Sequence, residues 1–216
     1  MFNYDNDYRY SDRNEAGQIL ADKLMKYKGG PGIVLAIPRG GVPVGYVIAK
    51  ELGFDLDIVL TKKIGHPLQS EYAIGAVSMT DRIVVPHPDV PDTYIEEETL
   101  RIRERLKQMY RDFNGDREPA KLTGKIAVLV DDGIATGNTI ATIIDMVKKQ
   151  SPAKTIIAVP VASRQAIDKL SAQVDEMICP LVPEFFTGVG AYYYDFQQTS
   201  DDEVKFFLNK FRSGDK

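Results

Sequence analysis

Two adjacent carboxylates, Asp131 and Asp132, directly follow a short apolar run and precede a loop of small residues. The stretch VLVDDGIATGNTI, residues 128–140, predicts the end of a buried strand, a tight loop and the first turn of a helix. Small side chains let a ligand approach the backbone closely, and the N–H groups at a helix N-terminus favour an anion. We therefore expect a phosphate in the loop and hydroxyl groups at the carboxylates, as a ribose 5-phosphate would supply.

A second anion loop is predicted at residues 38–41, where Arg39 is followed by Gly40 and Gly41. The apolar run 33–37 before it reads as a buried strand, and residues 42–52 carry the helical period. The turn therefore places a guanidinium beside two glycines at another helix N-terminus. The alternative is that the two glycines serve only as a tight connection between strand and helix.

Lys62 and Lys63 follow a third apolar run, residues 54–60. In a parallel sheet the end of this strand lies on the same edge as the other two loops, so either lysine could reach the same ligand. Lysines just beyond a strand are also commonly no more than solvated. Residues 65–76, which contain Tyr72, read as a glycine-bounded loop.

Residues 128–139 resemble the phosphoribosyl-pyrophosphate (PRPP) motif of type I phosphoribosyltransferases: two hydrophobic residues, two acids, Thr-Gly and a final Thr. The resemblance implies that Asp131 and Asp132 face the ribose hydroxyls. It also implies that the 5-phosphate is held by Ala135, Thr136, Gly137, Asn138 and Thr139.

The same resemblance implies roles for the other candidate residues. The pyrophosphate of PRPP would contact Arg39, Gly40, Gly41 and Lys62 or Lys63. Tyr72 would lie in a flexible loop that closes over PRPP, and the catalytic residues would be Asp131, Asp132, Arg39 and Tyr72. The family implies Mg²⁺ as cofactor, which the two aspartates would hold through water.

The expected function is transfer of ribose 5-phosphate from PRPP to a nitrogenous base, with release of pyrophosphate. The alternative is a non-catalytic regulatory protein that binds PRPP or nucleotides. Members of the family that act on 6-oxopurines commonly carry aspartate where this chain has Ala135, which argues against a hypoxanthine or guanine enzyme. The acceptor is otherwise a purine or pyrimidine base or another nitrogen nucleophile.

Alternation of strand and helix patterns predicts an α/β fold with a mainly parallel sheet flanked by helices. We expect a single domain over residues 1–216, with a core at about 31–180, a helical insertion at about 78–122 and a small C-terminal hood at about 181–204. Six aromatic residues within 185–196 could form a stacking wall for a base or could equally seal the sheet edge.

Composition and net charge limit the partners and the location that we expect for the protein. A net charge of −4 argues against nucleic acid as the main partner, and no apolar run approaches the length of a membrane span. With a polar N-terminus that lacks a secretory pattern, we expect a cytoplasmic protein, and we expect a homodimer. Cys179 reads as a core residue. His66 and His87 have no metal-ligand partner at useful spacing, so neither is given a role.

Overall fold

Our computed structural model describes residues 8–214, and the chain divides into two units. The first, which we call the core unit, comprises Met1–Ile58 and Pro119–Lys216, and the second, the hairpin unit, comprises Val59–Glu118. The N-terminal residues up to 7, which contributed to the expectation of no secretory signal, lie outside the described residues. The division into one domain with an insertion at 78–122 stays a prediction.

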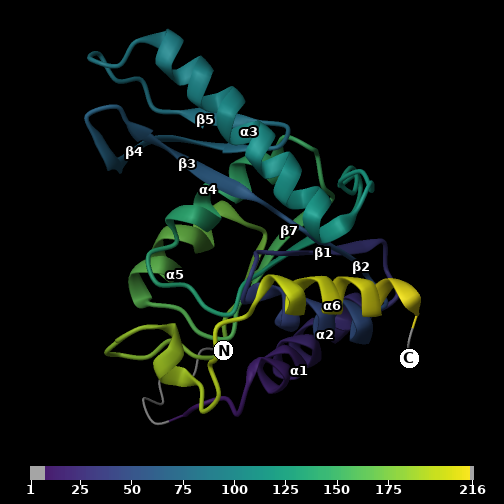
Figure 1. The fold of residues 1–216 in the computed structure, drawn as a ribbon. Coiled ribbons are helices and arrows are strands. Elements are labelled where there is room, and N and C mark those ends of the chain that lie inside the picture. The colour runs from purple at the N-terminus through teal and green to yellow at the C-terminus, as the bar shows by residue number, and fades with distance from the viewer. Residues whose placement is uncertain (1–7, 215–216) are drawn as a thin grey trace. The chain divides into compact units, whose positions relative to one another are not determined.

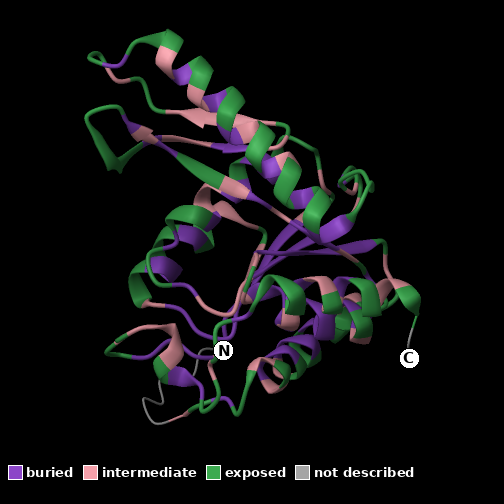
Figure 2. Cartoon of the chain, viewed as in Figure 1, coloured by how far each residue is buried: buried purple, intermediate pink, exposed green. Residues whose placement is uncertain are grey.

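The core unit is built on a parallel sheet of five strands in the order β2-β1-β6-β7-β8 (Figure 1). This confirms the expected α/β fold. The three central strands, β1, β6 and β7, are mostly apolar and almost wholly buried because helices cover both faces of the sheet, whereas the edge strands β2 and β8 carry acidic residues and are partly exposed (Figure 2). Their bounds are β1 Gly32–Ala36, β2 Asp55–Ile58, β6 Ile126–Val130, β7 Lys154–Ala158 and β8 Glu176–Ile178.

Helices lie on both sides of this sheet, with α1, α2 and α6 on one side and α4 and α5 on the other (Figure 1). Right-handed crossovers from β1 to β2 and from β6 to β7 lead in opposite directions along the sheet, so they place α2 and α4 on opposite faces. The bounds are α1 Arg13–Leu24, α2 Gly41–Leu52, α4 Asn138–Lys148, α5 Arg164–Leu170 and α6 Asp201–Ser213, with short 3₁₀ turns at Met25–Tyr27, Ser171–Gln173 and Val189–Tyr192. Within residues 8–214, none of the helices could cross a membrane.

The pairing of β1 with β6 fixes where the site loops lie. Ala36 and Val130, the last residues of these neighbouring strands, are partners in the parallel register. The backbone N–H of Ile37 donates to the carbonyl of Val130 at 2.8 Å. The loop after β1 and the two acids after β6 therefore leave the sheet side by side at its carboxyl edge.

The hairpin unit contains an antiparallel sheet in the order β3-β4-β5 and the long helix α3. Its elements are β3 Thr61–His66, β4 Gln69–Ser78, β5 Arg82–Val84 and α3 Asp92–Asn114. Ile64 and Ile74 of the sheet are buried, as are Ile95 and Ile102 of α3, whereas Met109 is 38% exposed and Tyr110 is buried.

The structure differs here from the local expectations. Strand β2 ends at Ile58, and Lys62 and Lys63 lie within β3 rather than in a loop at the edge of the parallel sheet. Residues 65–76, expected as a loop, belong mostly to the β3–β4 hairpin. The sequence did not reveal the boundary between β2 and β3, because residues 54–60 form one largely apolar run that includes the end of β2 and the residues before β3.

Candidate active site

The two acids stand at the point where β6 ends. Asp131 and Asp132 follow Val130 directly, and the backbone N–H of Asp132 donates to Oδ1 of Asp131 at 2.9 Å. The carbonyl oxygen of Asp132 accepts a hydrogen bond of 2.7 Å from the hydroxyl of Tyr193. Hydrogen bonds to the backbone N–H and to the carbonyl of Asp132 thus fix the orientation of the two acids.

The loop after β1 packs directly against these acids. A Cβ atom added to Gly40 would lie 1.9 Å from Oδ2 of Asp132, and one added to Gly41 would lie 2.6 Å from the carbonyl oxygen of Val130. The close approach of this loop to Val130 and Asp132 therefore requires glycine at both positions. The Pro38–Arg39 peptide bond in this loop is cis. The structure thus brings residues 38–41 and the acids together.

The Arg39 side chain is exposed to solvent. Its guanidinium lies 3.5 Å from Asp201, which is in the first turn of α6, and both side chains are substantially exposed. Such an exposed pair contributes little to stability, so Arg39 can exchange this partner for a phosphate.

Arg13 is a site residue that the sequence did not indicate. Its Nε and Nη2 donate to Oδ2 of Asp132 at 3.0 and 2.8 Å, and its Nη1 donates to the carbonyl of Gln197 at 2.8 Å. The Arg13 and Asp132 side chains are only 13% and 15% exposed. Asp132 is therefore held by a guanidinium from α1 as well as by its own loop.

The C-terminal aromatic segment meets the acids through Arg13 and Tyr193. The guanidinium of Arg13 lies 4.1 Å from the centre of the Phe196 ring, and the Phe196 and Tyr193 rings are 4.9 Å apart. Tyr192 and Tyr193 are buried, in a cluster with Val161. These tyrosines are part of the core. Phe196 contacts Arg13, the residue whose guanidinium binds Asp132.

Burial dominates the electrostatics of the acid pair. It raises the pKa of Asp131 well above the usual carboxyl value, and the neighbouring Asp132 carboxylate adds to the rise. Burial also raises the pKa of Asp132, although the positive charge of Arg13 opposes that rise. Asp131 therefore accepts a proton more readily than an exposed aspartate does.

This shift predicts a pH dependence of stability. Because the pKa of Asp131 is higher in the folded than in the unfolded chain, its favourable contribution is full below the ordinary value of 3.8 and is lost as the pH rises through the raised pKa. We expect urea titrations from acidic to neutral pH to show that Asp131→Asn becomes more stable relative to the parent as pH rises. Asp145→Asn, an exposed change on α4, should follow the parent, and identical slopes for all three proteins would contradict the assignment.

The loop after the acids has the form expected of a phosphate site. Helix α4 begins at Asn138, and Gly137 before it has φ +71°, a conformation that glycine adopts without strain. The predicted phosphate-contacting side chains Thr136 and Thr139 are exposed, as are Ala135 and Asn138.

Neighbouring residues hold this loop in place. The Ser163 hydroxyl donates to the carbonyl of Ala135 at 2.5 Å. The Lys169 ammonium donates to the side-chain oxygen of Asn138. A cation at this loop did not follow from the sequence, because Lys169 lies 31 residues further along the chain.

The other three predicted residues belong to the hairpin unit. Lys62 and Lys63 are exposed on β3, and the Lys63 ammonium pairs with the Glu71 carboxylate at 2.8 Å. Tyr72 lies on β4, 51% exposed. Their roles toward pyrophosphate and catalysis stay predictions.

Cys179 is confirmed as a core residue. It is 3% exposed, its thiol donates to the carbonyl of Leu181, and burial raises its pKa to about 12. A thiol so hard to ionise is a poor nucleophile at neutral pH.

Known proteins share this chain's sequence and fold. A family model described as the phosphoribosyl transferase domain matches residues 12–197. A protein of Mycobacterium tuberculosis, Rv0571c, whose name assigns it provisionally to the phosphoribosyl transferases, is 36% identical over 206 residues. That match covers 93% of this chain but 46% of the relative, so the chain spans about half the length of the curated relatives it matches.

A solved structure, TT1426 from Thermus thermophilus, is 36% identical with a TM-score of 0.84, and the match covers 94% of this chain and 99% of that one. The family model matches most of the chain, including both site loops and the residues that contact Asp132. The chain therefore belongs to the phosphoribosyl transferase domain family.

Proposed function

We propose that the protein transfers ribose 5-phosphate from PRPP to a nitrogen nucleophile and releases pyrophosphate. One observation carries the proposal: the Gly40 backbone approaches the Asp132 carboxylate so closely that the loop after β1 and the acids after β6 form a single surface. PRPP has a phosphate at one end, a diphosphate at the other and two hydroxyls between them. The two helix N-termini and the acid pair supply partners for all three parts.

Each loop has a distinct task in this proposal. Backbone N–H groups of residues 135–139, with the hydroxyls of Thr136 and Thr139, hold the 5-phosphate. Asp131 and Asp132 accept hydrogen bonds from the ribose hydroxyls. Arg39 and the backbone at Gly40 and Gly41 hold the diphosphate.

Lys62, Lys63 and Tyr72 of the hairpin unit complete the proposed set of residues. From the family resemblance alone, we propose that the ammonium of Lys62 or Lys63 serves the diphosphate and that Tyr72 helps to enclose PRPP. A lysine supplies a point charge that follows the developing negative charge without strict geometry.

The reaction follows from the charges. The bond between ribose C1 and the diphosphate oxygen breaks, and its electron pair leaves with pyrophosphate. The lone pair of the acceptor nitrogen forms the new bond to C1 from the opposite face, and the acceptor releases its proton to solvent water. Arg39 stabilises the negative leaving group, while the acid pair stabilises positive charge on the sugar.

The acid pair also fits Mg²⁺, which prefers carboxylate and phosphate oxygens and keeps several of its waters. Arg13 already occupies Oδ2 of Asp132, so the fit is through water and not as a complete protein cage. When bound, Mg²⁺ would neutralise charge on the diphosphate. Asp131 and Asp132 would orient its water ligands and the ribose hydroxyls.

The acceptor is proposed to be a purine or pyrimidine base other than hypoxanthine or guanine, or another nitrogen nucleophile. Ala135 offers no carboxylate at the position where 6-oxopurine members of the family commonly have aspartate. We propose that an aromatic residue of the segment 185–196 stacks on the planar base. A cytoplasmic homodimer remains the proposed form of the protein.

The test is pyrophosphate release from PRPP with Mg²⁺, measured on the purified chain with a panel of purine and pyrimidine bases. Release that depends on one base establishes the transferase and identifies its acceptor. PRPP binding without release for any base contradicts the transferase and favours the regulatory alternative.

A further inference from the structure

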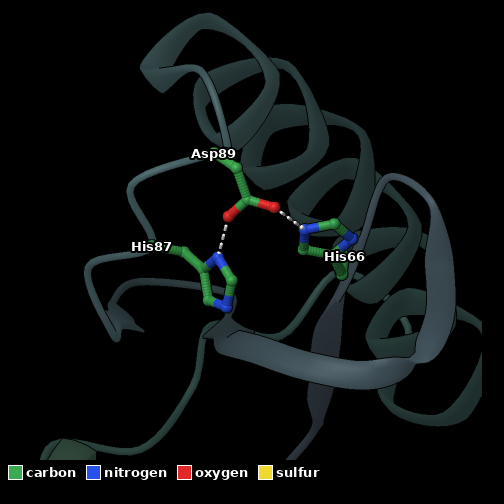
Figure 3. A group of neighbouring side chains, drawn as sticks. All are labelled: His66, His87 and Asp89. Atoms are coloured by element: carbon green, nitrogen blue, oxygen red, sulfur yellow. Dashed lines mark hydrogen bonds and ion pairs between the residues drawn. The ribbon is translucent and has the colours of Figure 1, made fainter.

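His66, His87 and Asp89 form a cluster in the hairpin unit (Figure 3). Nε2 of His66 lies 3.2 Å from Oδ2 of Asp89, and Nδ1 of His87 is hydrogen-bonded to Oδ1 of the same carboxylate. The carboxylate therefore lies between the two imidazole rings, whose centres are 5.1 Å apart. These are the two histidines of the chain, 21 residues apart in sequence.

The antiparallel sheet brings the three residues together. His66 is the last residue of β3, and β4 runs back along it to β5, after which the chain passes the end of the hairpin again. The N–H of Val85 still donates to Ile74 at 2.9 Å, and a turn closes with the N–H of Val90 donating to His87 at 3.1 Å. The spacing in sequence gave no sign of this approach. The expectation that neither histidine has a metal-ligand partner nearby was therefore wrong.

The donor atoms suit a transition-metal ion. One ligand atom from each residue lies within 4.8 Å of the others. Two imidazole nitrogens and one carboxylate oxygen are a common three-ligand set for Zn²⁺, which then keeps a fourth position open. Ligands at about 2.0–2.2 Å from a tetrahedral Zn²⁺ lie about 3.4 Å from one another, so ligand atoms that lie within 4.8 Å must draw together by up to about 1.4 Å to form the site.

Burial and access also fit such a site. The His66 side chain is 9% exposed, whereas those of His87 and Asp89 are 26% and 61% exposed, so the cluster is fixed on one side and open on the other. Tyr72 packs edge-on to both imidazoles, at 6.2 and 5.5 Å between ring centres. His87 also lines a pocket of about 600 Å³ with Pro86 and Ile95.

We propose that His66, His87 and Asp89 bind Zn²⁺ or a transition-metal ion of similar ligand preference. The ion links the end of the β3–β4 hairpin to the segment that precedes α3. This role stands on the cluster's own geometry and is independent of the proposed transferase reaction.

Metal binding has a consequence for the proton on His66. The N–H of Leu68 donates to Nδ1 of His66 at 3.2 Å, so Nε2 carries the proton that faces Asp89. Coordination through Nε2 of His66 requires a free lone pair there. The proton must leave or move to Nδ1, and in the second case the Leu68 contact breaks. Leu68 is 90% exposed, so no burial of its side chain opposes this change. Nδ1 of His87 donates to Oδ1 of Asp89, so His87 must likewise lose that proton to solvent or bind the ion through Nε2.

The test is calorimetric titration of the full, tag-free chain with Zn²⁺, accompanied by Co²⁺ absorption spectra. We expect one strong site with a tetrahedral Co²⁺ spectrum. Loss of a partner of a metal ligand commonly weakens affinity by about 10–100-fold, so loss of a ligand itself should weaken it by more than about 100-fold. His87→Gln and Asp89→Asn should both show this loss, and these more exposed positions avoid the folding risk of changing His66.

Two controls separate this site from others. Asp112→Asn changes an exposed acid on α3 of the same unit, and Asp145→Asn changes an exposed acid on α4 of the core unit. Both should bind Zn²⁺ as the parent does. Absence of Zn²⁺ binding, unchanged binding in His87→Gln and Asp89→Asn, or loss in either control would overturn the proposal.

Nitrogen-15 spectra of the imidazoles provide a second readout. Because the chain has two histidines, Zn²⁺ should shift the ring signals of both, and the His87→Gln spectrum assigns them. The Leu68 amide signal should move as well if the proton transfers to Nδ1. A spectrum in which either imidazole is unaffected by one equivalent of Zn²⁺ would contradict coordination by the pair.

Discussion

Replacing both acids, in the Asp131→Asn/Asp132→Asn variant, is expected to abolish pyrophosphate release from PRPP. Removal of a single group that stabilises transition-state charge commonly costs about 10²–10³ in rate, and this variant removes two at once. Asparagine keeps the shape of each side chain, so the Gly40 contact is preserved. The measurement is the rate of pyrophosphate release at saturating PRPP and Mg²⁺, with the base identified from the panel.

The control for this variant must account for Arg13. Without the Asp132 carboxylate the guanidinium loses its ionic partner, and breaking a largely buried pair costs stability. Circular dichroism and urea titration therefore accompany the assay, and Asp145→Asn on α4 serves as the exposed control. A folded double variant that releases pyrophosphate at the parental rate would exclude the acids from the reaction.

Gly40→Ala is expected to have the second largest effect. Gly40 has φ −61° and ψ −29°, which alanine adopts readily, so backbone strain plays no part. The added Cβ would lie 1.9 Å from Oδ2 of Asp132 and must displace the carboxylate or the loop. We expect PRPP affinity to fall by at least about tenfold and the free energy of unfolding to fall by about 1–3 kcal/mol, the usual cost of overpacking.

Gly30→Ala is the matched control. Its Cβ would meet nothing closer than 3.2 Å, the carbonyl oxygen of Tyr27, and it lies before β1, at the end of the strand opposite the site loop. PRPP affinity should match the parent in this variant. Equal PRPP affinity in Gly40→Ala and the parent would show that the close approach of the two loops has no part in binding.

The sequence predicted the parts of the site that are local. Residues 128–140 contain the strand end, the acids and the helix start in one stretch, so spacing alone places them together. The loop at residues 38–41 could be placed beside them because β1 and β6 both end at the carboxyl edge of a parallel sheet. These inferences needed only the period of each element and the direction of the strands.

Contacts between distant residues could not be predicted in this way. Arg13 reaches Asp132 from a helix 119 residues earlier, and nothing in its neighbourhood marks it except its place after the capping residue Asp12. Phe196 was noted as one of several aromatics, without a means of telling which would face the acids. Such contacts depend on how helices pack on the sheet, which periodicity does not specify.

The hairpin unit shows a different limit. The run at residues 54–60 has one apolar pattern but spans the end of β2 and the approach to β3, so the lysines were assigned to the wrong kind of element. His66 and His87 were judged by their spacing, while the antiparallel pairing of β3, β4 and β5 determines their distance. Short strands with few alternations leave too weak a signal to predict this pairing.

The most direct test of the central claim is a calorimetric titration with PRPP in the presence of Mg²⁺, comparing the parent chain with Thr136→Val/Thr139→Val. Valine keeps the shape of threonine and removes only the hydroxyl donors. Because a hydrogen bond to a charged group is worth about 1.5–3 kcal/mol, loss of two should weaken binding by at least about 100-fold. Binding of one PRPP per chain, weakened to this extent, is the predicted result. No binding to the parent would contradict the claim that this chain binds PRPP, and equal binding by both proteins would contradict the claim that the Thr136 and Thr139 hydroxyls hold the 5-phosphate.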